Sequence, residues 1–187
     1  MEKYLDDKEY IKEKKTVSLV KANLFSLALL PLFGLLYYVP FFIMWDFEGV
    51  AFGNLDMFCF ILIFIGGIVV HELIHGITWA LFAKNGFRSI KFGVLWKMLT
   101  PYCHCKEPLR LRHYILGGLS PLIFVGVIPA LVGIIIGNFY LMNFGFLFSA
   151  AAAGDIMIVL ALWNEDKDTF VQDHPSEAGC YVYRKRK

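Results

Sequence analysis

The chain has 187 residues, of which 58% are hydrophobic and 18% are charged, and its formal net charge is only +2. Soluble domains usually carry about 45–50% apolar and about 25% charged residues, so this composition excludes an ordinary soluble domain and indicates a membrane protein. Nucleic-acid binding is not expected, because the net charge is small and the aromatic residues lie in the apolar stretches rather than among Lys and Arg.

Four apolar stretches are long enough to cross a bilayer as helices, which takes about 20 residues each. The run from Tyr114 to Asn164 is too long for one crossing, and a turn-like Gly137-Asn138 divides it into two spans. The sequence therefore predicts an all-α membrane protein, a bundle of about four transmembrane helices forming a single membrane-embedded domain over residues 1–187. The expected spans lie at about residues 22–45, 57–83, 114–136 and 144–163.

The segment between the second and third spans has a different pattern, in which glycines and prolines divide short β-prone pieces such as residues 90–96. This pattern predicts a short β-like or re-entrant loop. We expect the loop to lie beside the functional site and to offer its edge to an extended substrate by β-strand addition.

The positions of Lys and Arg predict the orientation in the membrane, because cytoplasmic segments retain positive charge. All 18 fall in the leader before the first span, the segment between the second and third spans, or the tail. Both termini are therefore expected in the cytoplasm. Cys103, Cys105 and Cys180 then face a reducing compartment, so no structural disulfide is expected. The cationic residues are Lys3, Lys8, Lys12, Lys14, Lys15 and Lys21; Lys84, Arg88, Lys91, Lys97, Lys106, Arg110 and Arg112; and Lys167, Arg184, Lys185, Arg186 and Lys187.

His71-Glu72-Leu73-Ile74-His75 in the second span follows the pattern H-E-x-x-H. On a helix, histidines four residues apart lie on one face and can bind one metal ion, and Zn²⁺ is the ion that the pattern favours. Glu72 can then act as general base toward water that the ion activates. The alternative is a chance match with two structural histidines, but ionisable side chains inside a span are costly and are functional candidates by default.

Asp155 is the candidate for the third zinc ligand, since catalytic zinc sites usually have three protein ligands. It is the only charged residue between Tyr114 and Asn164. Asp155 and His75 lie at similar distances from the expected ends of their spans, so both are expected at one depth in the membrane. The alternative is a structural carboxylate paired with another buried polar group.

Two further groups remain open as contributors to the site. His104 lies between two cysteines and could add a ligand, although Cys-x-Cys lacks the paired spacing of a structural zinc motif. Asp173-His174-Pro175 in the tail predicts a turn, with a contact over the metal as the alternative.

The pattern resembles the site-2 protease group of intramembrane zinc metalloproteases, and more closely a family of small bacterial membrane proteins described as zincin peptidases. The resemblance implies cleavage of peptide bonds in or near membrane-embedded segments, with His71, His75 and Asp155 holding zinc and Glu72 activating water. It is carried by His71-Glu72-Leu73-Ile74-His75 and Gly154-Asp155, and less specifically by Tyr102-Cys103-His104-Cys105 and Asp173-His174-Pro175.

We therefore expect a zinc-dependent endopeptidase in a bacterial-type plasma membrane, with the lipid bilayer and a membrane protein or peptide substrate as its partners. The alternatives are a non-catalytic zinc-binding scaffold, or pseudoprotease, and a metal transporter that uses Glu72 as an additional ligand. The sequence leaves the substrate and the oligomeric state open.

Overall fold

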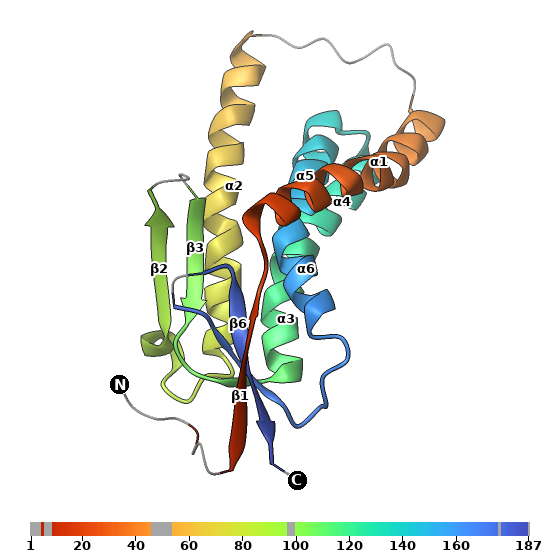
Figure 1. Ribbon diagram of the computed structural model, residues 1–187. Helices are drawn as coiled ribbons and strands as arrows, with labels where there is room; N and C mark the ends of the chain where they lie inside the picture. Colours follow the sequence, from red (N-terminus) through yellow and green to blue (C-terminus); the bar gives the residue numbers. More distant parts are fainter. Residues whose placement is uncertain (1–4, 6–8, 46–53, 97–99, 176, 187) are drawn as a thin grey trace.

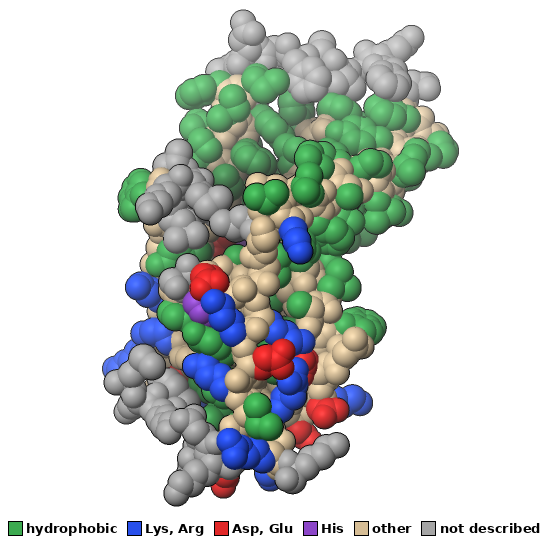
Figure 2. Space-filling view, in the orientation of Figure 1, with side chains coloured by type: hydrophobic (Ala, Val, Ile, Leu, Met, Phe, Trp, Pro, Cys, Tyr) green, Lys and Arg blue, Asp and Glu red, His purple; other side chains and the backbone are tan. Residues whose placement is uncertain are grey.

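Four long helical stretches dominate the computed structural model, which describes residues 5, 9–45, 54–96, 100–175 and 177–186 (Figure 1). All four are long and apolar enough to cross a membrane, as the composition predicted. Figure 2 shows apolar side chains covering the part of the surface that these helices form. The first two stretches are α1 (Leu19–Met44) and α2 (Asn54–Ala80).

The third and fourth stretches are interrupted helices. The third consists of α3 (Leu111–Pro121), the π-helical η3 (Leu122–Val127) and α4 (Ile128–Ile136). The fourth consists of α5 (Phe139–Ala151) and α6 (Ala153–Ala161), which meet at Ala152. It begins earlier than the expected residue 144, because the Asn138 side chain accepts a hydrogen bond from the Leu141 backbone N–H at 2.9 Å and caps α5.

The β-like segment between the second and third spans is a hairpin, as expected. After a short 3₁₀ turn, η2 (Gly86–Ser89), strand β2 (Ile90–Leu95) pairs antiparallel with β3 (Thr100–Cys105). The buried Glu107 holds this hairpin against the end of α2. Its carboxylate accepts hydrogen bonds from the Lys84 backbone N–H at 2.8 Å, the Ser89 hydroxyl at 2.6 Å and the Asn85 amide.

The expectation of an all-α protein is wrong for the polar leader and tail, which form a second sheet. Its antiparallel strands follow the order β1-β6-β5-β4. On its own, the leader has the pattern of a solvated charged segment. In the structure it pairs with the tail in a sheet whose inward-facing residues, such as Cys180 and Val182, are buried. The strands are β1 (Tyr10–Thr16), β4 (Leu109–Arg110), β5 (Phe170–Asp173) and β6 (Gly179–Lys185).

This four-stranded sheet places three distant segments at one end of the helices, because it joins the leader, the segment before α3 and the tail (Figure 1). Open sheet edges are not tolerated in the hydrocarbon region, so the whole sheet lies on one side of any bilayer that the helices cross. The described Lys and Arg residues lie in the same three segments, except Lys21 and Arg112, which lie in the first turns of α1 and α3. Lys3, Lys8, Lys97 and Lys187 lie outside the described residues.

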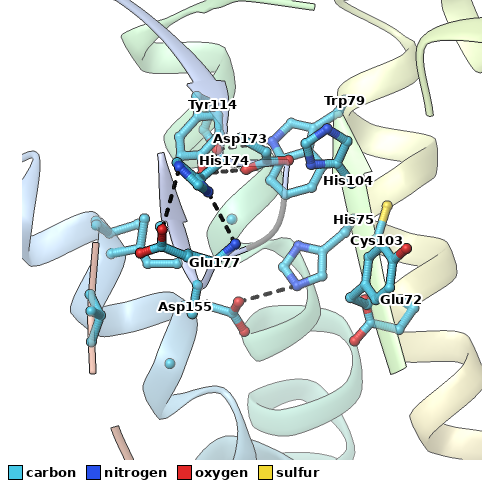
Figure 3. A pocket seen from close by; sticks show the side chains of 18 of the residues that line it. Glu72, His75, Trp79, Cys103, His104, Tyr114, Asp155, Asp173, His174 and Glu177 are labelled. Atoms are coloured by element: carbon cyan, nitrogen blue, oxygen red, sulfur yellow. Dashed lines mark hydrogen bonds and ion pairs between the residues drawn. The ribbon is translucent and has the colours of Figure 1, made fainter. Parts of the chain in front are cut away.

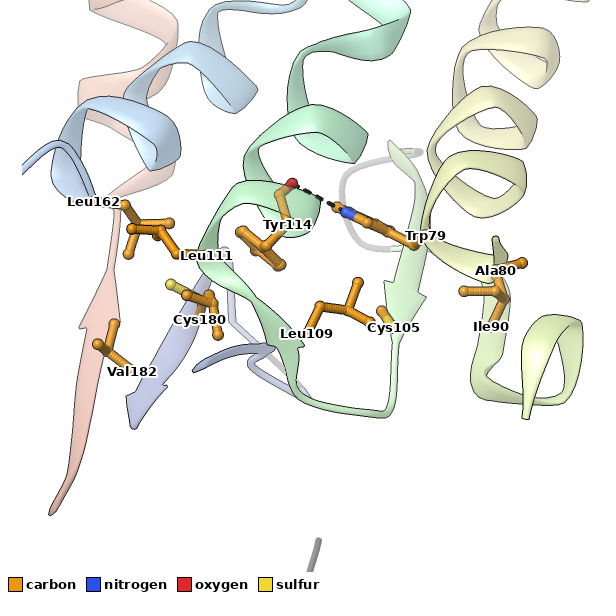
Figure 4. Close-up of a cluster of buried hydrophobic side chains, with 11 residues drawn as sticks. Trp79, Ala80, Ile90, Cys105, Leu109, Leu111, Tyr114, Leu162, Cys180 and Val182 are labelled. Carbon is orange, nitrogen blue, oxygen red and sulfur yellow. Dashed lines mark hydrogen bonds between the residues drawn. The ribbon is translucent and has the colours of Figure 1, made fainter. Parts of the chain in front are cut away.

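A cluster of buried hydrophobic side chains lies where the helices meet the sheet (Figure 4). Trp79 of α2 and Tyr114 of α3 contribute from the helices, and Val171 and Val182 contribute from β5 and β6. The Trp79 indole donates a hydrogen bond to the Tyr114 carbonyl oxygen at 3.1 Å. This packing fixes the sheet-proximal ends of α2 and α3 against the tail strands.

Glu165 ties the leader and the tail to the end of α6. Its carboxylate accepts two hydrogen bonds from the Arg184 guanidinium, both at 2.7 Å, and pairs with Lys15 Nζ at 2.6 Å. The Arg184 hydrogen bonds, supported by Lys15, lower the pKa of Glu165 to about 2. Strands β1 and β6 are thereby anchored to one carboxylate.

Candidate metal centre

The structure brings His71, His75 and Asp155 together, although α2 and α6 are far apart in the sequence. One ligand atom from each residue lies within 4.8 Å of the others. His71 Nε2 is 3.3 Å from Asp155 Oδ2, and His75 Nε2 is 3.4 Å from Asp155 Oδ1. Both histidines are buried, and the Asp155 side chain is 23% exposed. Two imidazoles and a carboxylate are a ligand set that suits zinc.

The hydrogen bonding of His75 leaves its Nε2 directed at Asp155 in a way that suits a metal ion between them. His75 Nδ1 lies 2.8 Å from the Gly117 carbonyl oxygen, which can only accept, so Nδ1 carries the proton. In a neutral imidazole Nε2 then presents its lone pair to the Asp155 carboxylate, and two acceptors facing each other repel. A metal ion between them removes that repulsion, so the residues present fit zinc. His71 Nδ1 is buried without a hydrogen-bond partner among the described residues.

An aromatic stack packs against the face of the His75 ring. The His75 ring stacks on Trp79 with centroids 5.0 Å apart, and Trp79 stacks on Tyr114 at 5.4 Å. Trp79 lies one helical turn after His75, so its position could have been noticed from the sequence. The contribution of Tyr114 could not, because it comes from another helix.

Glu72 lies in the wall of the cavity that contains the three clustered residues, which has a volume of about 550 Å³. Figure 3 shows it beside Cys103 of β3, whose backbone faces the Glu72 carboxylate. Glu72 does not belong to the ligand cluster that the described residues form. In the structure Glu72 therefore lies beside the candidate metal site and outside its cluster of ligand atoms.

Asp173 of the tail motif lies in the wall of the cavity and makes two hydrogen bonds there. This role was not expected from the sequence. Its carboxylate accepts a hydrogen bond from the Tyr114 hydroxyl at 2.6 Å (Figure 3). It accepts another from the Cys105 backbone N–H at 2.7 Å. Burial raises the pKa of Asp173 to about 6 despite these hydrogen bonds. Asp173 thus joins α3, β3 and β5 at one point.

His104 and His174 line the same cavity but do not join the ligand cluster of the described residues. After Asp173 the chain leaves β5, and the His174 backbone N–H donates to the Gly179 carbonyl oxygen at 2.9 Å. His174 Nδ1 also accepts a hydrogen bond from the Glu177 backbone N–H at 3.0 Å. Burial raises the pKa of the Cys103 thiol well above its ordinary value, which disfavours the thiolate form that a metal ligand needs.

The four cysteines are free in the structure. Cys105 and Cys180 are buried in the hydrophobic cluster, and burial raises the pKa of each thiol to about 12. Thiols of this kind pack as small apolar side chains.

A comparison with protein families assigns the chain. The family described as "Putative zincin peptidase" matches residues 64–170, which are more than half of the sequence. The match includes the H-E-x-x-H motif, the hairpin and Asp155, and it ends before Asp173. No curated protein and no solved structure gives a significant match. The chain belongs to this zincin peptidase family.

Proposed function

We propose that the protein is an intramembrane zinc metalloprotease that hydrolyses peptide bonds in or near membrane-embedded segments. One observation carries the proposal: three potential metal-ligand atoms cluster in the cavity, and the Glu72 carboxylate lies in the same cavity outside that cluster. A hydrolytic zinc site needs a base that does not bind the ion. A metal-transport site would be expected to use Glu72 as a further ligand.

The residues have distinct tasks in this proposal. His71, His75 and Asp155 hold zinc, which when bound polarises a carbonyl oxygen and makes water more acidic. Glu72 accepts a proton from the attacking water at its carboxylate and then delivers it to the leaving amine nitrogen. The bond from His75 Nδ1 to the Gly117 carbonyl oxygen keeps Nε2 directed at the ion.

The cavity favours an extended peptide as substrate. Its wall includes Tyr102, Cys103 and His104 of β3, and an edge strand binds extended peptides through main-chain hydrogen bonds. The surrounding helices expose apolar side chains, which favours a membrane protein or membrane peptide as the partner. The proposal places the protein as a multi-pass protein of a bacterial-type plasma membrane, with the sheet and both termini in the cytoplasm.

Zinc content and cleavage, measured together on two carboxylate variants, test this function. Glu72→Gln should retain about one zinc per chain, because all three ligands remain, and should lose about 10²–10⁴-fold in cleavage rate. Asp155→Ala should lose zinc as well as cleavage, because a catalytic site wants three protein ligands. Zinc is measured by elemental analysis of purified protein, and cleavage by mass spectrometry of a library of membrane peptides.

The two variants also separate the alternatives. A Glu72→Gln protein without zinc, together with an Asp155→Ala protein that keeps it, would refute the ligand assignment. A wild-type protein that holds zinc but cleaves none of the peptides would favour the non-catalytic scaffold. Ready loss of zinc from the wild type during buffer exchange would favour the transporter.

A further inference from the structure

Two backbone N–H groups of β3 point away from β2. The Lys106 N–H donates to the Ser89 carbonyl oxygen on the β2 side at 2.8 Å, whereas the Cys105 N–H donates to Asp173 Oδ2 on the opposite side at 2.7 Å. Because N–H directions alternate along an antiparallel strand, the Cys103 N–H lies on the same outer edge as the Cys105 N–H. The two groups are about 7 Å apart along the strand.

Each of these two N–H groups donates to a carboxylate in the wall of the metal cavity. The Cys103 N–H donates to Glu72, the proposed general base, and the Cys105 N–H donates to Asp173 (Figure 3). A peptide that lies along this edge is left with the carbonyl oxygens of β3 as pairing partners. The position of β3 therefore determines where the Glu72 carboxylate is held.

Asp173 is a firm anchor for β3, because a second element holds its side chain. Its other oxygen, Oδ1, accepts a hydrogen bond from the Tyr114 hydroxyl of α3 at 2.6 Å, and the residue is buried. The preceding residue in β5 supports the same contact, since Gln172 Nε2 donates to the Lys106 carbonyl oxygen. The end of β3 is thus fixed relative to both α3 and β5.

The same anchor reaches the candidate metal ligands through Tyr114. The Tyr114 ring stacks on Trp79, and Trp79 stacks on the His75 ring. Asp173 therefore bonds to the strand that holds the base and to a ring that supports a ligand. The position of the base relative to the metal depends on both supports.

We propose that Asp173 is a positioning residue for the general base: it fixes β3 relative to α3, so that the Cys103 N–H holds the Glu72 carboxylate beside the metal centre. The proposal rests on the proposed protease function. Misplacement of a reacting group by about 1 Å can cost about 10²-fold in rate, so a residue that touches neither the base nor the metal can control cleavage in this way. Asp173 lies outside the residues that the family match covers.

Cysteine amide signals test the connection without catalysis, because the two N–H groups belong to two of the four cysteines in the chain. Protein labelled with ¹⁵N-cysteine gives one backbone amide signal per cysteine, assigned by replacing each cysteine in turn with serine. Glu72→Ala should shift the Cys103 signal and leave the Cys105 signal in place. Asp173→Ala should shift the Cys105 signal directly and the Cys103 signal through the strand. Cys59, on the distant half of α2, serves as the internal reference.

Cleavage kinetics and zinc content separate positioning from loss of the fold. Asp173→Ala should lower kcat about 10²-fold, with KM and zinc content near the wild-type values, because the three candidate ligands remain. Asp173→Val is the second deletion variant, since valine suits a strand and offers no acceptor. Asp173→Asn should restore kcat and both amide signals, because its oxygen can accept from the Cys105 N–H and its NH₂ group can donate to the Tyr114 oxygen.

Tyr114→Phe is the matched control for the second hydrogen bond. It removes the hydroxyl but leaves the aromatic stack and the bond from the Cys105 N–H to Asp173. The Cys103 signal should therefore stay near its wild-type position, and kcat should fall less than in Asp173→Ala. An equal loss of kcat in the two variants would place the effect at the Tyr114 hydroxyl and overturn the proposal.

The remaining outcomes separate this proposal from the protease function. A Cys103 signal that stays in place in Asp173→Ala and Asp173→Val while the Cys105 signal shifts overturns the proposal. Zinc loss from both variants overturns it in favour of a role at the metal ligands. A protein that cleaves nothing but shows the coupled shift refutes the protease function and supports the link from Asp173 to Glu72. Full cleavage by both variants refutes only the positioning role.

Discussion

The carbonyl oxygen of Gly117 accepts the Nδ1–H of His75 at 2.8 Å because Pro121 leaves that oxygen without its helical partner. In an α-helix the N–H of residue 121 would bond to the carbonyl of residue 117, and proline has no N–H. The Ser120 hydroxyl also donates to the same oxygen, at 2.8 Å. A proline in α3 thus frees the acceptor that orients a candidate metal ligand on α2.

Gly117→Ala should weaken zinc binding about 10–100-fold, the range for lost support of a ligand. A Cβ at Gly117 would lie 2.1 Å from two atoms of the Trp79 indole, so the stack on His75 must shift. Overpacking of this kind also costs about 1–3 kcal/mol of stability. Chelator competition and thermal unfolding in detergent measure both effects.

Gly118→Ala is the matched control for this substitution. A Cβ at Gly118 meets its nearest atom, in Val159, at 3.6 Å, which is an ordinary contact. Zinc affinity and unfolding temperature should therefore stay near the wild-type values. Equal zinc loss in both variants would show that the effect comes from helix α3 in general and not from the His75–Trp79 stack.

Glu107 should make stability depend on pH at the acidic end. Burial alone would raise its pKa, but hydrogen bonds from Ser89, Asn85 and the Lys84 backbone N–H outweigh burial and lower the pKa below the ordinary value. A carboxylate with a lowered folded-state pKa contributes stability above its unfolded-state pKa of about 4.3 and loses it as pH falls through the folded-state value. Unfolding followed from pH 7 to pH 3 should show this loss.

Glu107→Gln should be less stable than wild type at pH 7, because a neutral amide replaces a carboxylate that accepts three hydrogen bonds, and its amide N–H₂ group cannot accept them. The difference between the two proteins should shrink as pH falls below about 4. A constant difference across this range would contradict the assignment of the charged form to the folded state.

Reporters fused to the two termini should place both termini on the same side of the membrane. The reason is that β1 and β6 pair along their whole lengths, from Tyr10↔Lys185 to Thr16↔Gly179. Both fusions are expected to be active with a reporter that works only in the cytoplasm. Two termini on the external side would contradict the charge-based orientation and leave the sheet intact. Termini on opposite sides would contradict the sheet itself.

The sequence was sufficient to identify the four apolar helices and the residues of the candidate metal centre. Hydropathy is a local property, so long uncharged runs can be read without knowing their neighbours. The cost of a charge in an apolar span singled out Asp155, and helical spacing placed His71 and His75 on one face. The structure then brings these three residues together.

Only the tertiary structure decided how the polar segments are used. Residues 10–16 carry mostly charged side chains, and nothing in them indicates that their partner is β6, more than 160 residues away in the sequence. The bond from Asp173 to the Cys105 N–H and the contact of Tyr114 with Trp79 likewise join separate elements. Strand pairing and side-chain bonds of this kind depend on which surfaces meet after the helices pack, and local pattern does not encode that choice.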